Sequence, residues 1–130
     1  MDRKKELENI IIGSLVNDFD EYYPSCRCSI TPEMFSDDFL GKIYSIMSKM
    51  EKAGVEVNLC TLWQYPESTL NGDQLSDLCG LVVDYDFNHK KYMYNRSVEL
   101  FGKSKRPKYT HVTFDDYVNK FVQMYFRRAC

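Results

Sequence analysis

The helical spacing of apolar residues most constrains what this chain of 130 residues can fold into. Near the N-terminus, apolar side chains recur at intervals of three and four positions, at Leu7, Ile10, Ile11 and Leu15. This spacing predicts an amphipathic helix over residues 4–17, because such positions share one helix face. A second stripe with helical spacing is formed by Phe39, Ile43, Ile46, Met47 and Met50. The pattern therefore favours helices that pack on other helices.

Helix-boundary residues delimit the second stripe. Thr31 is a candidate N-cap with Pro32 in the first helical position, and Ser36-Asp37-Asp38 repeats this start signal at once. Gly54 is the expected stop, because glycine readily adopts the left-handed conformation that ends many helices. We therefore expect a helix that starts after one of the two signals and ends before Gly54.

Two shorter helices are predicted after Gly54. Asn58 is expected to cap the first, which Pro66 ends because proline lacks the backbone N–H that a helix needs. Asn71-Gly72 is typical of a turn, and Asp73 is expected to cap the second helix.

A last helix is predicted over residues 113–128, where Thr113 and Asp116 resemble a capping box. Its apolar side is a continuous stripe of Phe114, Tyr117, Val118, Phe121, Val122 and Tyr125. The fold class that follows is all-α: a small helical bundle of about six or seven helices. We expect residues 1–130 to form one domain, with a basic and aromatic insertion at about 84–112.

Charge is divided unevenly along the chain. Residues 1–85 carry 7 Lys/Arg and 15 Asp/Glu, whereas residues 86–130 carry 10 and 4. Most of the positive charge lies at Lys90, Lys91, Arg96, Lys103, Lys105, Arg106 and Lys108. Aromatic residues are interleaved with it, so residues 87–108 are a candidate for weak binding of single-stranded nucleic acid. The alternative is a solvated loop whose aromatic side chains fasten it to the core.

The motifs of several enzyme classes are missing from the sequence. There is no G-x-x-x-x-G-K-[ST] phosphate-binding loop and no H-E-x-x-H zinc motif. The five cysteines and the lack of a signal-peptide stretch indicate reduced thiols in a cytoplasmic protein. A zinc site from Cys26, Cys28, His89 and His111 can be drawn, but small semi-buried thiols are the simpler interpretation. We expect no enzymatic activity, no catalytic residue, no cofactor, no metal and no membrane contact.

Several runs resemble one known family. Residues 6–15, Glu-Leu-Glu-Asn-Ile-Ile-Ile-Gly-Ser-Leu, resemble the E-x-E-x-x-V-L-G-x-L opening of the N-terminal domain of bacterial replicative DNA helicases, the DnaB family. The resemblance continues through residues 30–35, residues 43–44 and residues 50–62, where Asn58 replaces the family's aspartate. A looser match follows at residues 75–81, and Phe-Asp-Asp-Tyr-Val at 114–118 resembles the family's return into a long helix.

The resemblance implies a helical head with a hairpin that dimerises and docks replication partners without an active site of its own. The expected partner is a replication protein such as primase, a helicase or a helicase loader, and a homodimer is a further expectation. If the last helix stands clear of the head, its stripe becomes the partner or dimer interface. The alternative is that the stripe packs on the head of the same chain. Because the helicase ATPase domain is missing from the sequence, we expect no DNA unwinding.

Overall fold

The computed structural model describes residues 3–86 and 114–129, and these form helices joined by short connectors. The elements are α1 (Arg3–Asn17), α2 (Phe19–Cys26), the short 3-10 helix η1 (Pro32–Met34), α3 (Asp38–Lys52), α4 (Leu59–Gln64), α5 (Gly72–Asp86) and α7 (Phe114–Ala129). No residue in these two ranges lies in a strand. The expected all-α fold is confirmed.

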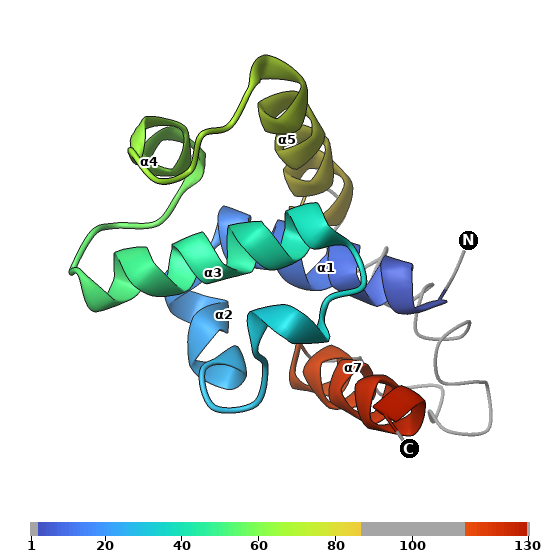
Figure 1. The fold of residues 1–130 in the computed structure, drawn as a ribbon. Coiled ribbons are helices and arrows are strands. Elements are labelled where there is room, and N and C mark those ends of the chain that lie inside the picture. Colours follow the sequence, from blue (N-terminus) through green and yellow to red (C-terminus); the bar gives the residue numbers. More distant parts are fainter. Residues whose placement is uncertain (1–2, 87–113, 130) are drawn as a thin grey trace.

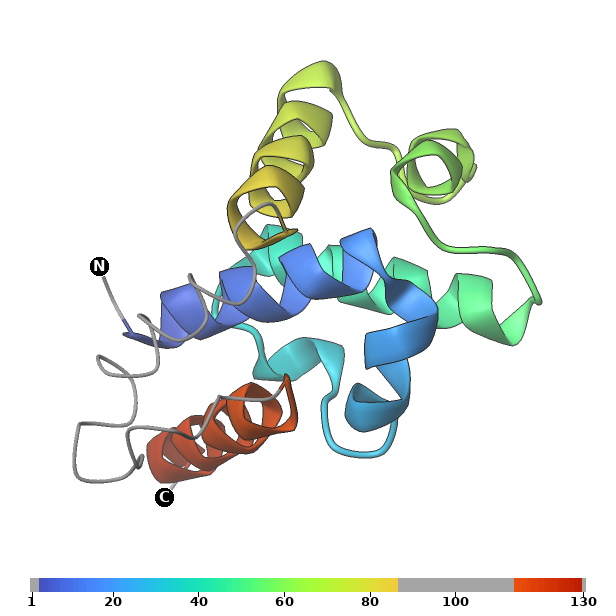
Figure 2. The same ribbon diagram turned by 180° about the vertical axis from the view of Figure 1, so that it is seen from behind.

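Helix α1 is the centre of the bundle. It packs against α5, α7, α2 and α3, and Figures 1 and 2 show α5 and α7 on opposite sides of it. Every residue from Ile10 to Val16 is buried, so α1 is covered nearly all round rather than on a single face. The helix expected over residues 4–17 is therefore present, and it is more deeply buried than an amphipathic surface helix.

Helix α3 begins and ends at the residues that the sequence favours. The Asp37 carboxylate accepts a hydrogen bond of 3.0 Å from the backbone N–H of Leu40, which makes Asp37 the N-cap. At the other end, Gly54 has a φ of +75°, and the N–H of Val55 donates to the carbonyl of Met50. The left-handed glycine thus turns the chain away from the helix as expected.

Two expected caps are wrong. The Thr31 side chain makes no capping hydrogen bond, and the first start signal yields only the 3-10 turn η1. Helix α5 begins at Gly72, because Asn71 and Gln74 form a reciprocal pair of side-chain-to-backbone bonds of 2.8 and 3.1 Å. The Asn71 side chain therefore accepts from the Gln74 N–H, so Asn71 rather than Asp73 caps the helix.

Helix α4 is short and its start is firmly capped. Asn58 and Thr61 satisfy each other's backbone N–H groups at 3.0 and 2.9 Å, which is a complete capping box. Leu62 points into the core, whereas 47% of the Trp63 surface is exposed. The helix therefore contributes one anchor to the core and presents an indole to solvent.

Candidate partner-binding surface

A buried ion pair joins α1 to the start of α3. The Glu8 side chain is fully buried and lies 3.2 Å from Nζ of Lys4, one helical turn earlier. Glu8 also accepts hydrogen bonds from the backbone N–H groups of Ser36 and Asp37, both at 3.1 Å, and from the Ser36 hydroxyl at 2.6 Å. Hydrogen bonds from four donors thus offset the free-energy cost of burying the carboxylate, which holds the segment that leads into α3 in place.

Lys4 extends this ion pair to η1 and α7. Its ammonium group donates to the carbonyl of Met34 at 2.6 Å and lies 4.5 Å from the centre of the Phe121 ring. A cation over an aromatic face is attracted by the ring quadrupole, and the attraction is stronger where water is excluded. One lysine therefore connects three elements that are far apart in the sequence.

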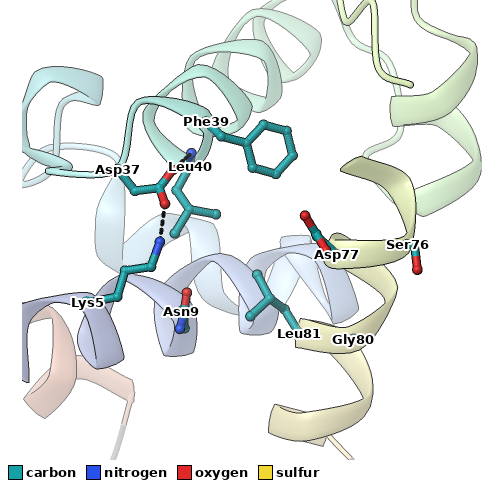
Figure 3. A pocket seen from close by; sticks show the side chains of 9 residues that line it. All are labelled: Lys5, Asn9, Asp37, Phe39, Leu40, Ser76, Asp77, Gly80 and Leu81. Carbon is teal, nitrogen blue, oxygen red and sulfur yellow. Dashed lines mark hydrogen bonds and ion pairs between the residues drawn. The ribbon is translucent and has the colours of Figure 1, made fainter. Parts of the chain in front are cut away.

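Beside this ion pair, an open groove lies between α1, α3 and α5 (Figure 3). Its volume is about 350 Å³, and its lining combines an apolar part with a polar rim. Phe39, Leu40 and Leu81 supply the apolar part. The rim consists of Lys5, Asn9, Asp37, Ser76 and Asp77, with Gly80 completing the lining. Figure 3 shows the ion pair between Lys5 and Asp37 closing one end of the groove.

The carboxyl group of Asp37 stabilises the fold, through its ion pair with Lys5 and its helix cap, and is not suited to proton donation. Partial burial by itself raises the pKa of Asp37, but hydrogen bonds from Lys5 and from the N–H of Leu40 outweigh burial. The resulting pKa lies below the ordinary value of 3.8, so the group is ionised at neutral pH and cannot donate a proton there. This favours a contact surface over an acid–base site in the groove.

The buried thiol and phenol also lack the properties of catalytic groups. Burial, with a smaller contribution from Asp115, raises the pKa of Cys26 to about 12. Its thiolate, the reactive form, is therefore scarce at neutral pH. Burial likewise raises the pKa of Tyr44, whose hydroxyl lies 3.1 Å from the carbonyl of Ile30 and 3.3 Å from that of Cys26. Both groups pack the junction of α2 and α3.

The stripe of α7 is largely a core feature. Tyr117, Val118 and Phe121 are buried within the chain, against α1 and α2. The expectation that these three residues form a partner interface is therefore corrected: the alternative, packing on the head of the same chain, describes them. The ring centres of Phe121 and Phe35 are 5.0 Å apart, and the Lys4 ammonium group lies over the Phe121 ring. Phe114, Val122 and Tyr125 are half-buried, and their role in a partner interface stays a prediction.

Other expected sites fall on parts of the chain that the structure does not describe. These are the candidate nucleic-acid contacts Lys90, Lys91, Arg96, Lys103, Lys105, Arg106 and Lys108, which lie outside the described residues. His89 and His111 of the alternative zinc site lie outside them too. Within residues 3–86 and 114–129, no cluster of three metal-ligating side chains occurs. None of the helices in these ranges is long and apolar enough to cross a membrane.

Among the residues whose side chains the structure describes, three large apolar side chains are exposed that the sequence patterns do not mark as binding residues. They are Val55, Trp63 and Phe126, with Phe126 the most exposed at 54%. Phe126 meets Tyr125 edge to face, with ring centres 5.5 Å apart. Phe126 follows directly on the apolar stripe in the sequence, so apolarity alone does not distinguish it from the stripe, although it lies on the outer face of the helix. Helical phase could have separated it from Tyr117 and Phe121.

The comparisons with known proteins concern the part of the bundle that runs from α1 to α5. The model of the DnaB-like helicase N terminal domain matches residues 1–96, about three quarters of the chain. The chain belongs to this family. The DnaB-like match covers α1 to α5, so the central helix, the buried ion pair and the groove all lie within it, whereas α7 follows it. Membership relates the chain to the N-terminal domain of replicative helicases and to DNA replication. Searches of curated proteins and of solved structures gave no match.

Proposed function

We propose that the protein is a non-catalytic protein–protein interaction module that acts in DNA replication in the cytoplasm, where it docks primase, a helicase or a helicase loader. Family membership supports the link to replication. The observation that carries the docking proposal is the large exposed aromatic side chain of Phe126 on a helix whose opposite side is anchored in the core.

The proposed contact is the α7 edge, which we define as Val122, Tyr125 and Phe126. Val122 and Tyr125 are half-buried and Phe126 is exposed, so the three residues lie along the border between core and solvent. A contiguous apolar surface bordered by polar residues is typical of a protein interface. The buried stripe beneath it holds the edge in a fixed orientation, which lowers the entropy lost on binding. A second copy of the chain is a further candidate partner for the same edge.

The test is sedimentation velocity of the full chain, alone and mixed with purified primase, replicative helicase or helicase loader from the same replication system. We expect a complex with one of these proteins, and Phe126→Asp should weaken it at least tenfold. The reason is that truncating a central aromatic contact costs about 2 kcal/mol or more, and a buried charge adds to this cost.

Asn119→Asp is the matched control. Asn119 is exposed on the same face of α7, seven residues and about 10 Å before Phe126, and its variant places the same new carboxylate on the helix. Binding should survive in this variant. Equal loss in both variants, or no complex with any of the three proteins and no self-association at tens of micromolar, would contradict the proposal.

A further inference from the structure

A second hollow lies on another side of the bundle, between the end of α2 and the second half of α3. Its volume is about 340 Å³. The Tyr23 hydroxyl donates to the Ser48 hydroxyl at 3.1 Å, which fixes α2 against α3 at this point. Arg27 from α2 and the pair Lys49 and Lys52 from α3 line the hollow. We call it the cationic hollow.

The cationic hollow carries positive charge in a part of the chain, residues 1–85, that is negatively charged overall. Residues 1–85 hold 7 Lys/Arg against 15 Asp/Glu, yet three of those cations meet here beside a single carboxylate, Glu51. Nζ of Lys49 lies 3.4 Å from a carboxylate oxygen of Glu67, in an ion pair whose side chains are mostly exposed. Among the described residues, Arg27 and Lys52 form no ion pair. The lining residues therefore carry a net charge of +2, or +1 when Glu67 is counted with its partner Lys49.

Two other hollows carry net charge of the opposite sign. The groove of Figure 3 combines Lys5 with Asp37 and Asp77, and a third hollow combines Lys42 with Glu33 and Asp38. Each carries a net charge of −1. The helix dipoles favour a cation at the C-terminal end of α2 and another at the C-terminal end of α3. They do not require these two C-terminal ends to meet at one hollow.

The lining also indicates which kind of anion fits. Single-stranded nucleic acid is bound by stacking its bases on exposed aromatic rings, but the two tyrosines here, Tyr23 and Tyr44, are only 5% and 2% exposed. The acidic surface of residues 1–85 also repels a long polyanion over its whole length. A short acidic peptide experiences mainly the local field and can lay an apolar side chain against Pro32.

We infer that the cationic hollow binds an acidic segment of a protein partner, with Arg27 and Lys52 pairing with its carboxylates. This site is separate from the α7 edge, and the inference does not depend on that edge. Arginine offers a planar pair of donors to a carboxylate, whereas Lys52 contributes a point charge. The interaction is expected to weaken with salt, because both cations are exposed.

The experiment measures fluorescence anisotropy of a labelled nonapeptide, three repeats of Glu-Leu-Asp, with the full-length protein. Lys52→Glu and Arg27→Glu should each weaken binding about fivefold to tenfold, since an attraction becomes a repulsion. Lys42→Glu is the matched control: it makes the same charge change on the same helix, at a lysine outside the cationic hollow. It should change binding less than twofold.

Three results would overturn the inference. They are no binding of the peptide at millimolar concentration, equal weakening by Lys42→Glu and Lys52→Glu, or tighter binding of labelled dT10 with the same dependence on Arg27 and Lys52. Equal weakening would indicate that the overall charge, including that of residues 86–130, attracts the peptide. Phe126→Asp should leave peptide binding unchanged, so failure here and failure of the α7 edge can be told apart. Melting curves check that each variant is folded.

Discussion

Removing the Glu8 carboxylate should reveal how much the buried ion pair stabilises the fold. In Glu8→Ala, the Lys4 ammonium loses its carboxylate partner but still faces the Met34 carbonyl and the Phe121 ring, and the N–H groups of Ser36 and Asp37 lose their acceptor. Leaving one partner of a buried pair behind costs about 3–5 kcal/mol. A domain of this size is stable by only about 5–15 kcal/mol, so the loss should be between about a fifth and the whole of its stability at 25 °C.

Lys4→Met should cost less than Glu8→Ala. In this variant Glu8 still accepts three hydrogen bonds, from the two backbone N–H groups and the Ser36 hydroxyl, and the methionine fills much of the space. We expect a loss of about 1–3 kcal/mol. The double variant removes both charges, so its loss should fall short of the sum of the single losses by about 1–3 kcal/mol.

The assay is urea unfolding followed by circular dichroism at 222 nm, in reducing buffer, for the four members of this cycle. Similar slopes against urea would show that the variants unfold between comparable states. The reasoning would be refuted if Glu8→Ala lost less than about 1 kcal/mol, a value typical of exposed pairs. It would also be refuted if the single losses simply added up in the double variant.

Four further predictions follow from the structure and the sequence. Because hydrogen bonds lower the pKa of Asp37, its contribution to stability is complete above its ordinary pKa of 3.8 and is lost as the pH falls below that value. Asp37→Asn should therefore flatten the stability curve below about pH 4, and an unchanged curve would contradict the role of its ion pair with Lys5. Iodoacetamide should label the exposed thiols Cys28, Cys60 and Cys79 long before the buried Cys26, as read by mass spectrometry, and early labelling of Cys26 would contradict the packing of α2. The buried hydroxyl of Ser14 has no hydrogen-bond partner among the described residues, so Ser14→Ala should raise the urea midpoint, equivalent to about 1 kcal/mol, and a fall would show that the hydroxyl is satisfied. If residues 87–108 bind single-stranded nucleic acid, affinity should drop steeply with salt and vanish when Lys103, Lys105 and Arg106 are changed to Glu; binding that ignores salt would reject this alternative.

Local signals in the sequence predict much of the fold. The caps at Asp37 and Asn58 and the stop at Gly54 depend on bonds between residues at most a few positions apart, so the sequence carries them directly. The error at Asp73 has a local cause as well. Asn71 and Gln74 have the spacing of a reciprocal cap, so Asn71 caps α5 as well as beginning the turn at Asn71-Gly72.

The surfaces could not be predicted in the same way, because they combine segments that are far apart in the sequence. Glu8 is 28 positions from Ser36, and Arg27 is 25 positions from Lys52, so no spacing rule brings them together. The stripe of α7 was visible as apolar, but apolarity alone does not distinguish packing on the same chain from packing on a partner. Helical phase places Phe121 and Phe126 on different faces of α7, but the packing of α7 against α1 and α2 decides which face lies in the core.

Hydrogen exchange of the full chain, measured with and without its replication partner, tests the docking role most directly. If a primase, helicase or loader binds at the α7 edge, amides in the second half of α7 should exchange more slowly in the complex, and those of α4 should not change. Unchanged exchange throughout α7 in a saturated complex, with protection confined to other elements, would contradict the account.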